Sequence, residues 1–214
     1  MRWSKKLAYC VGLLLTDGHL SKDGRHIDLT SKDVEQLETF KKCLGLKVKI
    51  GSKSSGRPGE ERYPRIQFGN VKFYKWLLTI GFVQNKTYGV GALEIPDRFF
   101  SHFLRGFYDG DGCSYSYFDP RWRSSFMFYT SFVAKSEKHI RWLRKNIRRL
   151  VGVKGRVVYT SRVYRLQYAK RESKIVIAYI YKGADKIYLS RKYDKIMKIL
   201  KVNAEVEKLV HSLP

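Results

Sequence analysis

Two stretches of the chain carry the same pattern of apolar positions. Tyr9–Gly18 and Phe103–Gly112 are both rich in apolar residues, have the character of a buried helix, and end in Asp-Gly. Aligned on that ending, each has a glycine six positions before its last residue, at Gly12 and Gly106. A pattern repeated at a distance of about ninety residues predicts a chain built from two similar halves.

The residues that follow each apolar run predict a β-hairpin and then a helix. The expected strands are His19–Lys22 with Arg25–Thr30 in the first half, and Ser114–Phe118 with Ser124–Phe132 in the second. The turns between them are Asp23-Gly24, a favoured hairpin turn, and the looser Asp119-Pro120. The expected helix caps are Thr30 or Ser31 and Ser136 at the N-termini, and left-handed Gly45 and Gly152 at the C-termini.

A second hairpin and further helix complete each half. The predicted strands are Lys47–Lys53 with Tyr63–Gly69, and Arg156–Thr160 with Val163–Ala169. The predicted closing helices are Val71–Ile80 in the first half, and Lys174–Tyr181 with Arg191–Leu200 in the second. The pattern therefore predicts an α+β chain of two halves, residues 1–98 and 99–214, with a linker at 83–98.

Charge indicates the partner. The 214 residues include 43 Lys and Arg against 19 Asp and Glu, a formal net charge of +24, which favours a polyanionic partner. Ribosome-associated and hyperthermophile proteins can also be this basic.

No apolar run reaches the roughly 20 residues of a membrane span. Three scattered cysteines predict neither a disulfide framework nor a zinc site and fit an intracellular location, and scarce Asn and Gln favour a thermophilic source.

The Asp-Gly endings place carboxylates where they need a cation. Asp17 and Asp111 follow apolar helices, so each lies at the negative end of a helix dipole beside carbonyls without helical partners. Each is followed by a glycine expected to end the helix in the left-handed conformation. A plain helix stop followed by a turn is the alternative explanation for one copy. If Gly12 and Gly106 let the helices pack closely, the two carboxylates meet, and Mg²⁺ suits such oxygen ligands.

At these residues the chain resembles the LAGLIDADG family of homing endonucleases in its two-motif, monomeric form. The matching segments are Cys10–Gly18 and Leu104–Gly112, and the repeated order αββαββα agrees over nearly the whole chain. The resemblance implies that Asp17 and Asp111 bind Mg²⁺ or Mn²⁺, with the backbone oxygens of Thr16 and Gly110 as further ligands. It also implies a catalytic lysine in each half, for which Lys86 and Lys192 are the candidates. Asp109 has no counterpart in the first motif, where Leu15 stands, and a packing or hydrogen-bonding role is expected for it.

The resemblance implies that each half forms a curved, saddle-like antiparallel sheet with one face on helices and the other on DNA. Strand alternation then selects the DNA-facing residues, since polar and basic side chains alternate with apolar ones. The candidates in the first half are His26, Asp28, Thr30, Lys32, Lys47, Lys49, Arg65 and Gln67. Those in the second half are Tyr115, Tyr117, Arg121, Arg123, Lys135, Arg156, Arg162, Arg165 and Gln167. Lys32 and Lys135, where the first sheet strands enter their helices, are also expected near the centre.

The leading hypothesis is a site-specific, divalent-metal-dependent endonuclease that cuts double-stranded DNA. The resemblance implies an intron-encoded monomer that reads a long asymmetric target and makes a staggered cut across the minor groove. One alternative is an RNA-binding maturase that assists splicing of its host intron. Another is a non-catalytic DNA-binding regulator on the same fold, which would tolerate loss of the acidic pair and usually carries an extra DNA-binding module. Nothing in this sequence resembles such a module.

Overall fold

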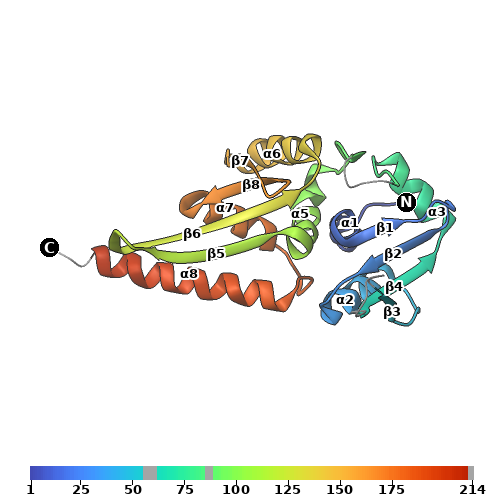
Figure 1. Cartoon of the computed structure of the whole chain (residues 1–214), viewed down its shortest axis with the longest axis horizontal. Helices are drawn as coiled ribbons and strands as arrows, with labels where there is room; N and C mark the ends of the chain where they lie inside the picture. The colour runs from blue at the N-terminus through green and yellow to red at the C-terminus, as the bar shows by residue number, and fades with distance from the viewer. Residues whose placement is uncertain (55–61, 85–88, 212–214) are drawn as a thin grey trace.

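The computed structural model describes residues 1–54, 62–84 and 89–211 and consists of two similar units on either side of a central helix pair (Figure 1). The first unit contains α1 (Lys5–Asp17), β1 (Gly18–Leu20), β2 (His26–Thr30), α2 (Val34–Leu44), β3 (Gly51–Ser54), β4 (Arg62–Gly69) and α3 (Val71–Thr79). The second contains α5 (Asp97–Asp111), β5 (Cys113–Asp119), β6 (Trp122–Ala134), α6 (Glu137–Val151), β7 (Arg156–Thr160), β8 (Val163–Ala169), α7 (Lys170–Tyr181) and α8 (Ser190–His211). The predicted repeat is therefore confirmed as a structural repeat.

Each unit has a four-stranded antiparallel sheet with the same strand order. The orders are β1-β2-β4-β3 and β5-β6-β8-β7, so in both sheets the second strand of each hairpin lies in the centre. The second sheet is much longer, since β5 and β6 extend well beyond the length of β1 and β2 (Figure 1). The predicted α+β class is confirmed, and the sheet of the second unit has longer strands than the sheet of the first.

Strand alternation decides which face of each sheet is buried. Ile27, Leu29 and Ile66 have no exposed surface and point to the helices, whereas Gln67 between Ile66 and Phe68 is exposed. The second sheet follows the same rule, with Phe132 and Leu166 fully buried. Helices pack on this apolar face: α2 and α3 contact the first sheet, and α6, α7 and α8 contact the second. Within residues 1–54, 62–84 and 89–211, no helix covers the opposite face of either sheet, and this face is called the open face.

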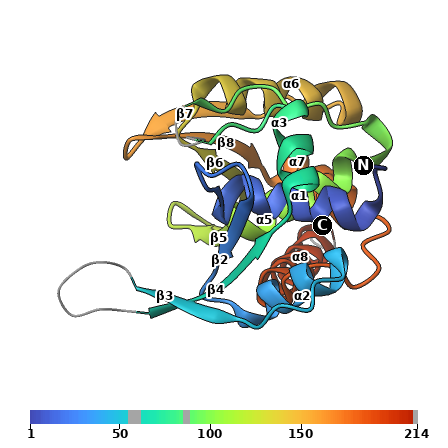
Figure 2. The ribbon, with the colours of Figure 1, turned by 90° about the vertical axis from the view of Figure 1, so that its right-hand side faces the viewer.

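The two motif helices, α1 and α5, lie side by side at the junction of the units (Figures 1 and 2). A Cβ atom added at Gly12 would lie 2.2 Å from the carbonyl oxygen of Phe103. A Cβ atom added at Gly106 would lie 2.1 Å from the carbonyl oxygen of Tyr9. Both distances are far below van der Waals contact, so the helix backbones touch, which confirms the predicted reason for these glycines.

The two Asp-Gly glycines differ from the sequence expectation. Gly18 and Gly112 have φ values of −85° and −81° and are extended, so neither is a left-handed helix stop. Strand β1 instead begins at Gly18 itself, and strand β5 begins at the residue after Gly112. An added Cβ atom would lie 2.6 Å from the carbonyl oxygen of Leu14 or 2.3 Å from the ring of Tyr108. Close packing on the preceding helical turn, not backbone handedness, therefore requires glycine at both positions.

The caps of the helices that follow are partly as predicted. Ser136 accepts a hydrogen bond from the backbone N–H of His139, and Gly45 and Gly152 are left-handed, as expected. The predicted cap at Thr30 or Ser31 is wrong, because α2 begins later and has Asp33 at its N-cap. Ser31 accepts from the Asp33 backbone N–H and donates to Gln36, so it orders the turn before the helix.

Several predicted boundaries shift. Strand β3 begins at Gly51, so Lys47 and Lys49 lie in the irregular segment before it. Strand β6 spans two more residues at each end than expected, α7 begins four residues earlier, and α8 extends to His211. The longer α8 packs on the apolar face of β5 and β6 and supports their extended hairpin. Within the described segments, no helix combines the length and apolarity that a bilayer span requires.

The segment between the units is packed against them. Phe82, Val90 and Leu93 are buried, and the hydroxyl of Ser136 donates to the carbonyl oxygen of Val90. His139 contacts the neighbouring carbonyl of Gly91 through Nδ1, at 2.8 Å. The linker thus holds the start of α6 in place. The division of the chain at residues 98 and 99 stays a proposal.

Candidate functional site

The C-terminal ends of α1 and α5 meet at one place. A Cβ atom added at Gly110 would lie 1.9 Å from Oγ1 of Thr16 and 2.7 Å from Oδ2 of Asp17. The carboxylate of Asp17 therefore lies directly against the residue that precedes Asp111. Asp17 is half-buried and accepts a hydrogen bond from Thr16 Oγ1 at 3.2 Å, whereas Asp111 is exposed. The structure thus brings the two predicted carboxylates to the same junction.

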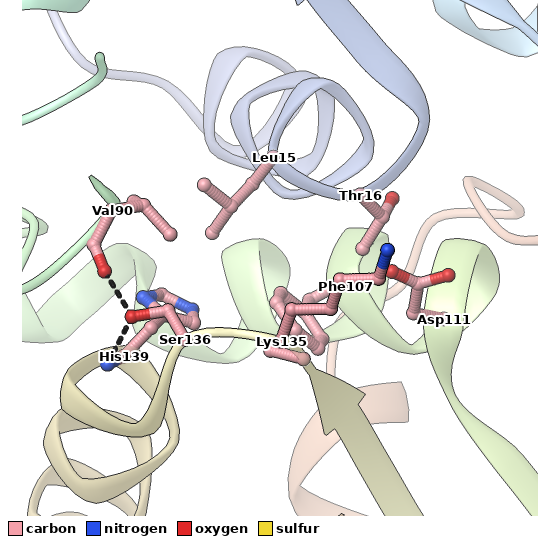
Figure 3. A pocket seen from close by; sticks show the side chains of 9 residues that line it. Leu15, Thr16, Val90, Phe107, Asp111, Lys135, Ser136 and His139 are labelled. Carbon is pink, nitrogen blue, oxygen red and sulfur yellow. Dashed lines mark hydrogen bonds between the residues drawn. The ribbon is translucent and has the colours of Figure 1, made fainter. Parts of the chain in front are cut away.

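Two small cavities flank this junction, and each draws residues from both motif helices. The first, of about 200 Å³, is lined by Thr16 of α1, Asp111 of α5 and Lys135 (Figure 3). The second, of about 290 Å³, is lined by Asp17, Gly110 and Lys32. Each cavity therefore has one motif aspartate, the residue before the other motif aspartate, and one lysine from the loop between a sheet and its helix. Lys32 and Lys135 lie where the sequence expected them.

Lys192 binds the end of α5 from the start of α8. Its ammonium group donates hydrogen bonds to the carbonyl oxygens of Tyr108 at 2.8 Å, Gly110 at 2.9 Å and Gly112 at 2.7 Å. An ammonium group has three N–H donors, so these bonds use all of them. Burial lowers the pKa of Lys192, and the nearby carboxylates of Asp109, Asp17 and Asp111 act in the opposite direction. The lysine supplies a fixed positive charge at the negative end of the α5 dipole.

Asp109 has the hydrogen-bonding role expected for it. Its buried carboxylate accepts from the hydroxyl of Tyr9 at 2.8 Å and from the backbone N–H of Leu189 at 2.9 Å. Burial raises the pKa of Asp109 to about 6, while those two hydrogen bonds act to lower it. Because Leu189 lies just before α8, this carboxylate fixes the position from which Lys192 reaches the end of α5.

The two residues between Leu189 and Lys192 bind the other half of the protein. Ser190 donates from its backbone N–H and its hydroxyl to Glu35, in the first turn of α2. Arg191 forms a two-pronged salt bridge with Asp33, through Nε at 2.7 Å and Nη2 at 2.6 Å. Sequence reasoning missed both contacts, because the partners are more than 150 residues apart and no local pattern marks them. Residues 189–192 thus join the two halves beside the carboxylates.

The open sheet faces carry most of the predicted DNA-facing residues. Thr30 pairs with Arg65 in the first sheet, and Arg156 pairs with Gln167 in the second. The remaining predicted residues on these open faces are His26, Asp28, Gln67, Tyr115, Tyr117 and Arg165. Gln167 donates to the hydroxyl of Tyr115 at 2.7 Å, so part of this surface is ordered by its own polar contacts.

Some predicted contact residues lie elsewhere or are less accessible. Asp28 is only 3% exposed, and its carboxylate lies 3.9 Å from the ammonium group of Lys53. Arg121 and Arg162 occupy the turns at the tips of the two hairpins of the second sheet. Lys86 and the side chain of Arg123 fall outside the described part of the structure.

No cluster of three or more His, Cys, Asp or Glu side chains that could hold a metal occurs in the described part of the chain. The oxygen donors at the junction are instead two carboxylates and the main-chain carbonyls beside them. The Gly110 carbonyl accepts from Lys192 and, like every carbonyl oxygen, has a second lone pair. This donor set is chemically that of a hard cation such as Mg²⁺, which needs one or two carboxylates together with water and phosphate oxygens.

No protein-family model matches the sequence, and no curated protein matches it either. Similarity appears in three dimensions. The homing endonuclease I-WcaI bound to its DNA recognition sequence has a TM-score of 0.63 at 11% identity, over 90% of this chain and 86% of that one. I-DmoI in complex with DNA and Mn has a TM-score of 0.51 at 16% identity, over 82% and 95%. Full-length DUF199/WhiA from Thermatoga maritima has a TM-score of 0.56 at 15% identity, over 95% and 68%.

These neighbours include proteins described as homing endonucleases and a protein described by its LAGLIDADG domain without mention of a nuclease. The shared fold extends over most of each chain, although the identities are too low to transfer an activity. With two repeated units, two open antiparallel sheets and two motif helices in contact, the chain has the LAGLIDADG homing endonuclease fold in its two-motif, single-chain form.

Proposed function

We propose that this chain is a site-specific, divalent-metal-dependent endonuclease that cuts both strands of DNA. The observation that carries the proposal is the junction of α1 and α5, where the Asp17 carboxylate lies against Gly110, next to Asp111. Two carboxylates so placed repel one another unless cations lie beside them. A structural role alone would not require an acidic residue at the end of both helices.

The open sheet faces supply the DNA-binding surface in this proposal. An excess of basic residues gives the chain a net charge of +24, and Arg and Gln side chains on exposed strands match the donor and acceptor groups of the major groove. Because the two sheets differ in length and in side chains, they read an asymmetric target. One chain supplies both halves, so the active form is a monomer. The target spans about two helical turns, and the cut is staggered across the minor groove.

In the proposed reaction Asp17 and Asp111 hold Mg²⁺ or Mn²⁺, with the carbonyl oxygens of Thr16 and Gly110 as further ligands. Such an ion lowers the pKa of a bound water and stabilises negative charge on the phosphate. The chain's own residues position the strands and neutralise charge. Lys32 and Lys135 line the two cavities with the aspartates, and Lys192 adds a fixed charge. Lys86 remains the proposed counterpart of Lys192 in the first half.

The decisive experiment is cleavage of a plasmid that carries the intron-free insertion site, in the presence of Mg²⁺ or of excess EDTA. Linear plasmid is expected with Mg²⁺ and none with EDTA. A restriction enzyme that cuts the plasmid once should then convert the linear product into two fragments of defined length. Intact plasmid under both conditions, together with tight and salt-sensitive binding of the same DNA, would favour a DNA-binding regulator. The similarity to WhiA is the reason to include this second outcome. A maturase has no specific structural support, and splicing of the host intron with and without protein tests it.

Replacing Lys192 with methionine is expected to lower the cleavage rate about 100-fold and to lower the thermal unfolding midpoint. Three carbonyl oxygens lose their donor, and each hydrogen bond to a charged group contributes roughly 1.5–3 kcal/mol. Lys192→Arg is expected not to restore activity, because a planar guanidinium cannot reproduce three convergent bonds. Single-turnover cleavage and thermal unfolding measure both effects.

Lys195→Met is the matched control, since Lys195 is an exposed lysine in the same turn of α8. It should leave both cleavage and the unfolding midpoint near those of the parent protein. A Lys192→Met protein that cleaves at the parent rate would refute the role assigned to Lys192.

A further inference from the structure

Two cysteines that are distant in sequence lie together between α1 and α2. Cys10 is fully buried on α1, and its sulfur lies 3.9 Å from the carbonyl oxygen of Phe40 on α2. Cys43 lies three residues after Phe40, which is one helical turn further along α2. Cys10 and Cys43 thus lie within one helical turn of the same point of contact between α1 and α2, and each thiol affects the pKa of the other. No function described above uses either thiol.

Only one of the two thiols is reachable from solvent. Cys43 lines a cavity of about 600 Å³ whose other walls include Lys6, Lys42 and Lys186. The cavity is open to small solutes and rich in positive charge, whereas Cys10 lies beneath it with no exposed surface. The pair thus consists of an accessible thiol in a basic environment and a buried thiol behind it.

The electrostatic surroundings also favour the thiolate form at Cys43 over that at Cys10. The neighbouring Cys10 thiol lowers the pKa of Cys43, and the charges of Lys6 and Arg105 add to this effect, while partial burial of Cys43 opposes it. Burial raises the pKa of Cys10 well above its usual value. Because the thiolate is the form that reacts with oxidants, Cys43 is the thiol that reacts first.

We propose that Cys10 and Cys43 form a redox-sensitive thiol pair, which a hydroperoxide converts into a disulfide between α1 and α2. Cys43 is the peroxide-reactive residue, and Cys10 is the resolving residue. The pair is separate from the proposed nuclease site, because Cys10 lies near the middle of α1, about two helical turns before Asp17.

The chemistry balances with hydrogen peroxide as the oxidant. The Cys43 thiolate attacks one peroxide oxygen, the O–O bond breaks, and the departing hydroxide takes up a proton to become water, which leaves a sulfenic acid on Cys43. The Cys10 sulfur then attacks the Cys43 sulfur, the S–O bond breaks, and the hydroxide leaves as water with the thiol proton. The two thiols lose two electrons in total, and the peroxide gains them.

The product cross-links helices that carry different parts of the site. Helix α1 ends in Asp17, and α2 begins beside Asp33 and Glu35, which bind Arg191 and Ser190. A covalent bond between these helices closes a loop of the unfolded chain and so stabilises the folded state. The oxidised protein is therefore expected to unfold at a temperature about 5 °C or more above that of the reduced protein.

The third cysteine is an internal reference. Cys113 is exposed at the start of β5, and its sulfur donates a weak hydrogen bond to the carbonyl oxygen of Ser114 at 3.8 Å. It belongs to the other half of the chain. An oxidant that acted on thiols by exposure alone would modify Cys113 first and would leave Cys10 unchanged.

The experiment treats the intact, fully reduced protein with hydrogen peroxide, blocks the remaining thiols, and maps the peptides without reduction. The free-thiol count in denaturant is expected to fall from three to one, with Cys10 and Cys43 linked to each other and Cys113 still free. Dithiothreitol should restore three thiols. Cys113→Ser should still form the linkage, whereas Cys43→Ser should leave Cys10 as a thiol.

Three results would overturn the proposal. The first is a Cys43 that stops at sulfenic or sulfinic acid while Cys10 stays reduced. The second is oxidation that falls on Cys113 before Cys43. The third is a disulfide that joins two separate chains instead of α1 and α2 of one chain. Because the readout is the peptide map, failure of the nuclease assay would not affect the outcome.

Discussion

Asp17→Asn and Asp111→Asn are each expected to abolish double-strand cleavage and to leave DNA binding nearly unchanged. Asparagine keeps the shape of the side chain but removes the negative charge that, in the proposed site, holds a divalent ion. Loss of one bound ion removes several kcal/mol of stabilisation from the transition state, which corresponds to a fall of about 1000-fold or more in rate. The open sheet faces that are proposed to bind DNA lie outside the substitution, so affinity is expected to be retained.

The two variants are tested together by cleavage and by binding to the same duplex in Ca²⁺ or EDTA. Asp97→Asn is the matched control, since Asp97 is an exposed aspartate in the first turn of α5, where it forms a salt bridge with Arg149. It makes the same chemical change at the opposite end of the same helix. Full cleavage by either motif variant, with the control equally active, would remove the catalytic assignment and leave a DNA-binding role.

Side chains at the helix crossing are expected to have the largest effect on stability. Gly106→Ala and Gly12→Ala each place a methyl group within 2.2 Å of a backbone oxygen on the partner helix. Neither backbone can move without separating α1 from α5. The meeting of the two motif aspartates depends on this contact between the helices. We expect a loss of about 3–5 kcal/mol in the free energy of unfolding, or roughly 10 °C in the midpoint.

Gly91→Ala is the control for this pair, because a Cβ atom added at Gly91 has no neighbour within 4 Å. It should change the unfolding midpoint by no more than a degree or two. Chemical denaturation of the purified variants measures the difference. If Gly106→Ala were as stable as Gly91→Ala, the helices would not be in backbone contact, and the proposed meeting of Asp17 and Asp111 would lose its basis.

The pattern of residues was most informative where structure follows from local periodicity. The strands β7 and β8 and the left-handed Gly45 and Gly152 appear as predicted, whereas the first hairpin has a five-residue loop, residues 21–25, in place of the predicted two-residue turn at Asp23-Gly24. These features depend on backbone preferences and on alternation between two faces, which the chain carries in short segments. The close approach at Gly12 and Gly106 was also predictable, since the same costly residue occurs at the same place in both helices.

The exact start and end of elements was less predictable. Strand β3 begins at Gly51 and not at Lys47, and α8 extends past Leu200 to His211. Both differences depend on what the segment packs against, because α8 gains its length on the apolar face of β5 and β6. Intrinsic preference is a weak guide where tertiary packing supplies most of the stabilisation.

Repetition in the sequence was sufficient to identify the two halves and their paired acidic helix ends. The net charge of +24 separately indicated a polyanionic partner. Three-dimensional packing decided that Gly18 and Gly112 are extended, that Lys192 binds three carbonyl oxygens, and that Ser190 and Arg191 join α8 to α2. The physical reason is distance along the chain. A repeated local pattern records what each segment prefers by itself, whereas a hydrogen bond between residues 155 or 158 positions apart exists only once the two halves have docked.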